Sequence, residues 1–175
     1  MKILKITGII ILGIIALFYL TALIVSRDYQ VEREVVINKP KEQVFDYIKH
    51  LRNQDNYNIW VKMDPNQKTD FTGTDGQVGF IYAWDGEKAG KGEQEIKSIK
   101  EGESIDLELR FKRPFESTAY AYFQTSSPTP DETKVTWGMK GVNPYPMNIM
   151  NLVMDGMLGK DLAAGLNNLK ATLEK

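Results

Sequence analysis

The chain has no cysteine and only one histidine among its 175 residues. Without cysteine it forms no disulfide and offers no thiolate for catalysis. One histidine and no cysteine cannot supply an ordinary zinc site, so the sequence predicts neither a metal centre nor a cofactor. The histidine, His50, follows the first predicted helix of the domain in a charged turn, and we expect it at the surface.

The chain also lacks a charge imbalance, because 22 basic residues face 23 acidic ones and the net charge is −1. Proteins that bind nucleic acid carry a basic excess for the phosphates, so we expect no nucleic-acid partner. The glycine-rich segment 73–79 lacks the lysine of a phosphate-binding loop and does not open a helix, which indicates a turn. With 42% hydrophobic residues, the length and composition fit one globular domain.

The first 27 residues differ from the rest of the chain. From Ile6 to Ser26 there are 21 consecutive uncharged residues, rich in Ile, Leu, Ala and Val. As a helix this run would extend about 31 Å, close to the hydrocarbon thickness of a bilayer. A helix also satisfies its own backbone groups within lipid. We therefore interpret residues 1–27 as a transmembrane anchor and residues 28–175 as the domain that it carries.

Two further expectations concern this anchor. The alternative is a cleaved signal peptide, whose apolar region is shorter, roughly 7–15 residues, and precedes a small-x-small cleavage site. No convincing site follows the run, which favours a retained anchor. Lys2 and Lys5 make the N-terminal side more basic than the balanced pair Arg27 and Asp28. The positive-inside rule then predicts a single-pass protein of the cell membrane with its domain outside the cytoplasm.

Alternating apolar and polar residues predict that the domain is a strand, short helices, a run of antiparallel strands and a long C-terminal helix. Short loops join most of the strands, which indicates antiparallel neighbours. The predicted strands are Asp28–Asn38, Gly76–Trp84, Lys91–Lys100, Ser104–Phe111, Ser117–Thr125 and Lys134–Lys140, and the predicted helices are Lys41–Leu51 and Pro146–Lys175, with a possible turn of helix within Asn53–Pro65.

The C-terminal helix carries a continuous apolar stripe. Methionines at 147, 150, 154 and 157 are followed by leucines at 158, 162, 166, 169 and 173. At 100° per residue these positions share one broad face, which would cover the apolar face of the sheet. A strongly curved sheet that holds a helix leaves a gap between them, and such a gap is suited to a ligand.

Several segments together resemble the START/Bet v1-like superfamily, also known as the polyketide cyclase/dehydrase and lipid-transport (SRPBCC) family. They are INKPKEQVFDYI, IWVKMDP, GTDGQVGFIYAWDG, GKGEQEIKSIKEGESIDLELRFKRPFE, TKVTWGM and YPMNIMNLVMDGMLGKDLAAGLNNLKATLE. The resemblance covers residues 29–175, and the chain is similar to membrane-anchored or free bacterial members of the family. It implies an α+β helix-grip fold: about seven antiparallel strands curved around the C-terminal helix, with a hydrophobic cavity between them. Members include lipid carriers, cyclases, co-chaperones and hormone receptors, so it implies no single function.

The inward faces of the strands and the C-terminal helix give a candidate ligand-binding site. Asp161 and Tyr82 are its candidate orienting groups, and Gly165 is expected to leave room for the ligand. Methionine is adaptable and suits varied apolar ligands. The complete set of candidate cavity-lining residues is Trp60, Tyr82, Trp84, Leu107, Leu109, Trp137, Met150, Met154 and Asp161.

Three functional hypotheses follow. The preferred one is a membrane-anchored module that binds a hydrophobic small molecule or lipid, with no defined catalysis. The second is a cyclase- or hydrolase-type enzyme that uses Asp161, Tyr82 or Glu93 as an acid or base. The third is a protein-interaction or regulatory module whose cavity is filled by side chains. Glu93 and Glu95 share a strand face, and we interpret this face as the solvated outside of the sheet rather than an acidic site.

Overall fold

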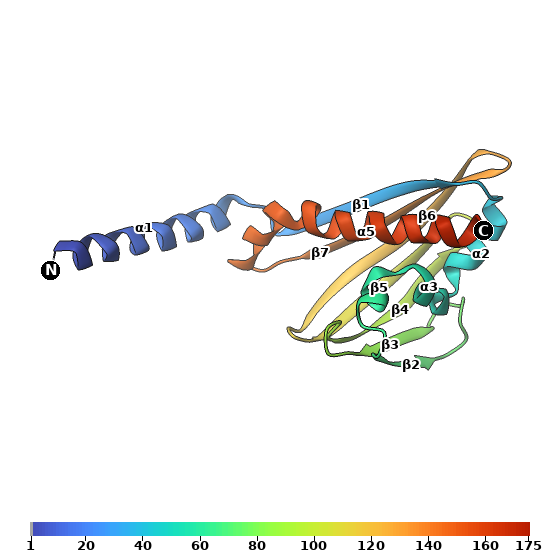
Figure 1. The fold of residues 1–175 in the computed structure, drawn as a ribbon, viewed down its shortest axis with the longest axis horizontal. Helices are drawn as coiled ribbons and strands as arrows, with labels where there is room; N and C mark the ends of the chain where they lie inside the picture. Colours follow the sequence, from blue (N-terminus) through green and yellow to red (C-terminus); the bar gives the residue numbers. More distant parts are fainter. Residues whose placement is uncertain (1) are drawn as a thin grey trace.

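The computed structural model describes residues 2–175 and consists of an N-terminal helix that projects from an α+β domain (Figure 1). The projecting helix, α1 (Lys2–Ile24), is long and apolar enough to cross a membrane and is exposed along nearly all of its length. The domain contains, in order, β1 (Asp28–Ile37), α2 (Lys41–Lys49), η1 (Leu51–Asn53), α3 (Gln54–Tyr57), α4 (Ile59–Met63), β2 (Lys68–Thr72), β3 (Ile81–Asp85), β4 (Lys91–Lys100), β5 (Ser104–Arg113), β6 (Ser117–Thr129), β7 (Glu132–Val142), η2 (Met147–Met150) and α5 (Asn151–Leu173).

One antiparallel sheet of seven strands, in the order β1-β7-β6-β5-β4-β3-β2, forms the frame of the domain. Alternation decides which side chains face its interior, because successive residues of a strand point to opposite faces. In β5, for example, Ile105, Leu107 and Leu109 are buried. They pack with the inward residues of β6 and β7 in one hydrophobic core.

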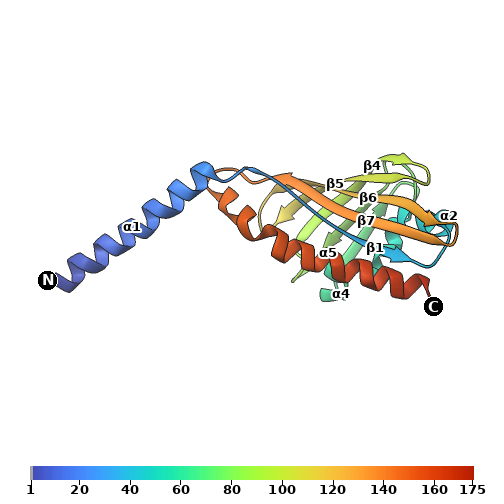
Figure 2. The same cartoon turned by 90° about the horizontal axis from the view of Figure 1, so that it is seen from above.

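Helix α5 lies along the concave side of this sheet, as Figures 1 and 2 show from two directions. Its second half faces the core through buried residues at 159, 162, 165, 166, 169 and 173. The expected helix-grip fold is thus confirmed: a curved seven-stranded sheet, a long C-terminal helix and an N-terminal apolar helix.

The structure differs from the sequence prediction most clearly at three elements. The expected strand Gly76–Trp84 begins only at Ile81, because Gly76 and Gly79 adopt positive φ angles of 78° and 87° in the preceding turn. The C-terminal helix starts at Asn151, and the residues before it form the separate short helix η2. Strand β2 lies in a polar segment for which the sequence predicted no strand, because its lysine, threonine and aspartate residues give no alternation of apolar and polar side chains.

The outer face of the sheet carries a cluster of ion pairs around Glu93 and Glu95, as expected for a solvated face. Arg110 binds Glu93 at 2.8 Å and Glu95 at 2.7 Å, and it also contacts Glu108. Lys112 completes the cluster with Glu93 at 2.7 Å. These hydrogen bonds, from Lys112 first and Arg110 second, hold the pKa of Glu93 below its ordinary value. The two glutamates therefore belong to the solvated face and not to an acidic site.

Helix α1 is joined to the domain by side-chain hydrogen bonds to the carbonyl groups that its C-terminal end leaves free. Asn148 Nδ2 donates to the carbonyl oxygens of Ala22 at 2.7 Å and Val25 at 2.8 Å. Asn151 Nδ2 donates to those of Ser26 at 2.9 Å and Arg27 at 3.1 Å. The start of the C-terminal helical segment therefore lies directly beside the end of α1.

Candidate functional site: a tryptophan-lined cavity under the short helices

A cavity of about 180 Å³ lies between the inner face of the sheet and the segment that contains α3 and α4. Most of its wall is apolar, and no residue of α5 contributes to it. All three tryptophans of the chain lie on it. The lining residues are Gln54, Asn58, Trp60, Val61, Met63, Gln67, Tyr82, Trp84, Lys88, Ala89, Gln94, Leu107, Leu109, Phe111, Ala121, Trp137 and Met139.

The floor of the cavity comes from the central strands. Leu107 of β5 pairs with Ala121 of β6, and the small alanine side chain leaves space above the sheet. Trp137 of β7 stacks on Phe123, with ring centroids 4.9 Å apart, and meets Trp60 edge to face at 5.9 Å. Aromatic contacts of this kind fix ring orientation in addition to the hydrophobic contribution. The floor is therefore rigid and apolar.

Three amide side chains supply most of the polarity at the buried end of the cavity. Gln54 Oε1 accepts hydrogen bonds from Gln94 Nε2 at 2.9 Å and from Asn58 Nδ2 at 3.0 Å. Asn58 Oδ1 in turn accepts from the backbone N–H of Trp60 and so caps α4. All three amides are buried. Because they are uncharged, this end of the cavity suits a ligand with neutral polar groups.

A carboxylate fixes the turn that borders the outer end of the cavity. Asp64 Oδ2 accepts from the backbone N–H groups of Lys88 at 2.7 Å and Ala89 at 3.1 Å. The hydrogen bonds from Ala89 and then Lys88 lower the pKa of Asp64 below its ordinary value. Asp64 thereby ties the end of α4 to the β3–β4 turn, and both segments contribute lining residues.

Tyr82 is the lining residue with a titratable hydroxyl. Its Oη donates to Asp55 Oδ1 at 2.7 Å. Burial, and after it this hydrogen bond, raises the pKa of Tyr82 above its ordinary value. The tyrosine is therefore neutral at physiological pH and already has an acceptor for its proton.

The structure brings six of the nine candidate residues together on the cavity wall: Trp60, Tyr82, Trp84, Leu107, Leu109 and Trp137. The other three, all from the C-terminal helical segment, do not reach it. Met150 is exposed, and Met154 is half-buried against the edge of the core. Asp161 is half-buried and makes no side-chain hydrogen bond or ion pair within residues 2–175. Helical phase predicted a common face, but the methionine half of this face extends beyond the part of the sheet that holds the cavity.

The expectation that Gly165 leaves room for a ligand is also wrong. A Cβ atom added at Gly165 would lie 2.6 Å from Cζ3 of Trp137, so the indole already occupies this space. The glycine serves close packing between α5 and β7. Trp137 therefore separates the helix from the cavity.

Sequence reasoning missed the buried amides and the outer lining residues. Gln94 lies between Gly92 and Ile96 on the inward face of its strand, so alternation alone was enough to place it inside. Gln54 and Asn58 lie in short helices within a polar segment that carries no periodic signal. Lys88 and Ala89 lie in a turn, and only the tertiary structure brings them to the cavity.

This architecture, a curved sheet with a long helix and an apolar cavity, defines a helix-grip domain. The family model "Polyketide cyclase / dehydrase and lipid transport" matches residues 28–174. The chain belongs to this family. No curated protein matches the chain.

Solved structures share the fold at low sequence identity. A protein from Nitrosospira multiformis is 18% identical, with a TM-score of 0.58 over 82% of this chain and 94% of that one. Ara h 8.0201 is 14% identical, with a TM-score of 0.53 over 82% and 99%. DynU16, from the dynemicin biosynthetic locus, is 11% identical, with a TM-score of 0.59 over 83% of this chain and 47% of its own. At these identities the likeness establishes the fold alone.

Proposed function

We propose that the protein is a membrane-anchored module that binds a hydrophobic small molecule or lipid in the cavity under α3 and α4. The observation that carries this proposal is the cavity itself, with its apolar wall, its three tryptophans and a cluster of uncharged amides at its buried end. Ligand sites are commonly apolar with a few polar groups that fix orientation. Membership of a family named for cyclases and lipid transport supports the same class of ligand.

The size of the cavity limits the manner of binding. Its volume of about 180 Å³ lies below the roughly 300–1,000 Å³ typical of ligand pockets. A lipid therefore inserts one part, such as the end of an acyl chain or a ring, and leaves the remainder outside. Met63 and Lys88 are exposed lining residues at the outer end, where such a remainder would lie.

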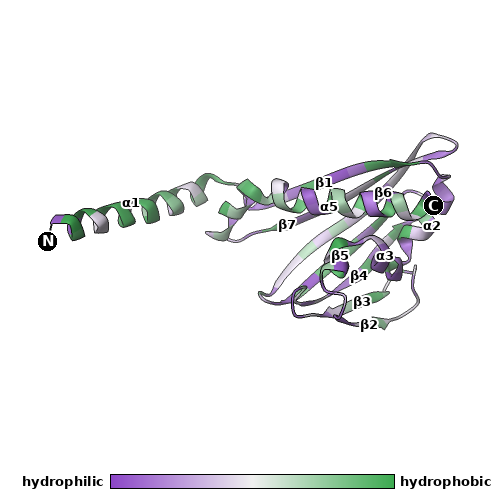
Figure 3. Ribbon diagram, in the orientation of Figure 1, coloured by the Kyte–Doolittle hydropathy of each residue, from purple (hydrophilic) through white to green (hydrophobic). Residues whose placement is uncertain are grey.

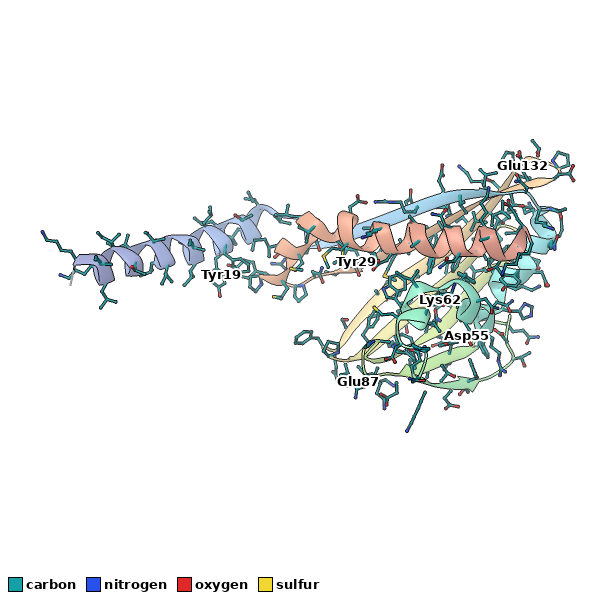
Figure 4. All side chains as sticks on the ribbon, in the orientation of Figure 1. Tyr19, Tyr29, Asp55, Lys62, Glu87 and Glu132 are labelled. Atoms are coloured by element: carbon teal, nitrogen blue, oxygen red, sulfur yellow. The ribbon has the colours of Figure 1, made fainter. Side chains whose placement is uncertain are left out.

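This outer end of the cavity and the end of α1 lie at the same end of the strands. The start of β1 pairs with the end of β7, and the same end of the sheet continues through the pairs Phe111 with Ser117, Gly92 with Phe111 and Trp84 with Gly92. Figure 4 labels Glu87, beside the lining residues Lys88 and Ala89, on the α1 side of the domain. A ligand that leaves the bilayer would therefore approach the domain from the end of the sheet at which the cavity opens.

Helix α1 supplies the membrane attachment in this proposal. Its length and its hydropathy fit a single span, and the lysines at its N-terminal end favour a cytoplasmic N-terminus with the domain outside. The intact mass of the protein purified from membranes tests retention of the anchor. We expect the mass of the full chain, and a mature N-terminus near Ser26 would instead identify a signal peptide.

The tryptophans allow a direct test of binding. Dansyl-labelled undecanoic acid is added to the full chain in lipid nanodiscs, and energy transfer from tryptophan to dansyl is measured against empty nanodiscs. We expect saturable transfer in the wild type. Ala121→Met, which fills the floor of the cavity, should abolish it. Ala83→Met is the matched control, because Ala83 is not a lining residue, although it belongs to the same sheet.

The outcomes of this test distinguish a cavity that binds a ligand from a cavity that is filled by the protein's own side chains. Transfer that is equal in both variants would show that the dansyl group does not occupy the cavity. No transfer from tryptophan to any member of a dansyl-labelled panel of fatty acids, neutral lipids and polyketides would favour the protein-interaction hypothesis.

Binding is favoured over catalysis by the positions of the candidate acids and bases. Glu93 is held in ion pairs on the outer face of the sheet, and Asp161 lies away from the cavity. Tyr82 reaches the cavity, but its hydroxyl is bonded to Asp55. The three groups therefore do not converge on one position, which an acid–base mechanism requires.

A further inference from the structure

The exposed apolar residues between β7 and the first turn of α5 form a second hydrophobic surface beside α1. We name Tyr145, Met147, Met150, Leu152 and Val153 the apolar foot. Each has an exposed side chain, with fractional exposures from 38% for Tyr145 to 63% for Leu152. Exposed apolar patches of this kind usually mark an interaction site. We propose that the apolar foot lies in the interface of the bilayer that α1 enters, a proposal that rests on α1 being a membrane anchor.

The depth of the foot follows from its contacts with α1. The ring of Tyr145 lies 6.1 Å from that of Tyr19, and Asn148 Nδ2 reaches the carbonyl oxygen of Ala22. Tyr19 and Ala22 both belong to the uncharged run from Ile6 to Ser26. If that run spans the hydrocarbon layer, the segment bonded to it lies at the depth of its outer end. A tyrosine pair at this level fits the aromatic belt of membrane proteins.

The composition of the segment fits this position. From Gly141 to Met154 there is no charged residue, and Lys140 and Asp155 are the first charges on either side. Burial of a charge in the interface is costly, whereas methionine, leucine and tyrosine are favourable there. Figure 3 shows that the hydrophobic colouring of α1 continues into the start of α5. The foot is thus continuous with the anchor in both structure and composition.

The lipid interface explains the exposure better than a second copy of the chain. The foot contacts α1 through η2, so a partner protein on it would also have to lie beside the membrane-spanning helix. Lipid already surrounds α1 at this depth and requires no additional partner. Two contacts with the bilayer would also restrict the tilt of the domain and hold the outer end of the cavity near the membrane.

Single cysteines test this directly, because the natural chain has none. The full chain carrying Met147→Cys, Leu152→Cys, Met157→Cys or Asn167→Cys is labelled with the environment-sensitive dye NBD. It is placed in nanodiscs of phosphatidylcholine and phosphatidylglycerol, prepared in parallel with one copy and with two copies of the chain per disc. Spin-labelled phosphatidylcholine then acts as a quencher within the lipid. Asn167, an exposed residue farther along α5, is the matched control, and Ile11→Cys reports on the anchor.

We expect blue-shifted emission and strong lipid quenching at positions 147 and 152, weaker quenching at 157, and none at 167. Quenching at 11 with none at 147 and 152 would overturn the foot and leave the anchor in place. No quenching at 11 would overturn both. A blue shift at 147 and 152 without lipid quenching, lost in discs that hold one copy, would assign the foot to a second copy and overturn the proposal.

Discussion

The two halves of α5 carry the same kind of apolar sequence in different surroundings. In the second half, Leu162, Leu166 and Leu169 are completely or almost completely buried against the sheet. In the first half, Leu152, Val153 and Met157 are exposed, and at 100° per residue Val153 and Met157 lie on the side of the helix opposite Leu162 and Leu166. The difference shows that apolar residues on a helix indicate a preference for a nonpolar environment but not which environment supplies it. Here the core takes one half, and we propose that lipid takes the other.

The largest expected effect contrasts a leucine from each half. Leu166→Asp places a carboxylate where only 1% of the side chain is exposed, and it should lower the free energy of unfolding by more than about 4 kcal/mol. Leu152→Asp adds the same group at a position 63% exposed, in the first turn of α5, and should change it by less than about 0.5 kcal/mol. Urea unfolding of the full chain in mild detergent measures both.

An equally small effect at both leucines would show that the second half of α5 is not part of the core. The helix-grip packing would then be wrong at the element that gives the fold its name. A large effect at both would instead place the first half of α5 in an apolar environment within the protein itself.

Two glycines of the same helix give the second contrast. A Cβ at Gly165 would approach Trp137 to 2.6 Å, so Gly165→Ala should destabilise the protein by about 1–3 kcal/mol through overpacking. At Gly156 there is no atom within 4 Å of the added Cβ, so Gly156→Ala should stabilise by about 0.5–1 kcal/mol through helix propensity. Thermal unfolding of the two variants measures the opposite signs. If Gly165→Ala stabilised the protein instead, the indole of Trp137 would be able to shift away from α5, and it would not form a rigid wall between α5 and the cavity.

These contrasts also show how far the sequence leads. Strict alternation in β5 predicted the inward positions of Leu107 and Leu109, because a strand has only two faces. Six of the nine predicted lining residues lie on the cavity; five of them are on strands, where alternation placed them, the sixth, Trp60, is in α4, and none is on α5. Their role in ligand binding stays a prediction. Met150, Met154 and Asp161 were misplaced, because helical phase gives a face but not the element opposite each turn.

The remaining errors have the same origin in long-range packing. The contact between Gly165 and Trp137 joins residues on two elements, and neither residue alone indicates that the indole fills the gap. Gln54 and Asn58 become site residues only because α3 and α4 fold over the sheet. A pattern along the chain cannot reveal which loop covers which strand.

The smallest expected effect concerns the ion pair that ties the exposed half of α5 to the sheet. Arg33 of β1 lies close over Gly159 and binds Asp155 through both carboxylate oxygens, at 2.9 and 3.0 Å. The hydrogen bond from Arg33 lowers the pKa of Asp155 below its ordinary value of 3.8. A group with a lowered folded-state pKa stabilises the fold above its unfolded-state pKa, and this contribution disappears as the pH falls through the folded-state pKa.

Asp155→Asn should therefore lower Tm slightly at neutral pH, less than either glycine substitution changes it, because exposed ion pairs contribute little. The difference from wild type should vanish once the pH is well below 3.8. Asp161→Asn is the control, since Asp161 lies on the same helix and has no ion-pair partner within residues 2–175. Thermal scans across this pH range provide the measurement. A difference that persists in acid would mean that Asp155 acts through packing or helix capping instead of through its charge, and that the exposed half of α5 is held to the sheet by other contacts.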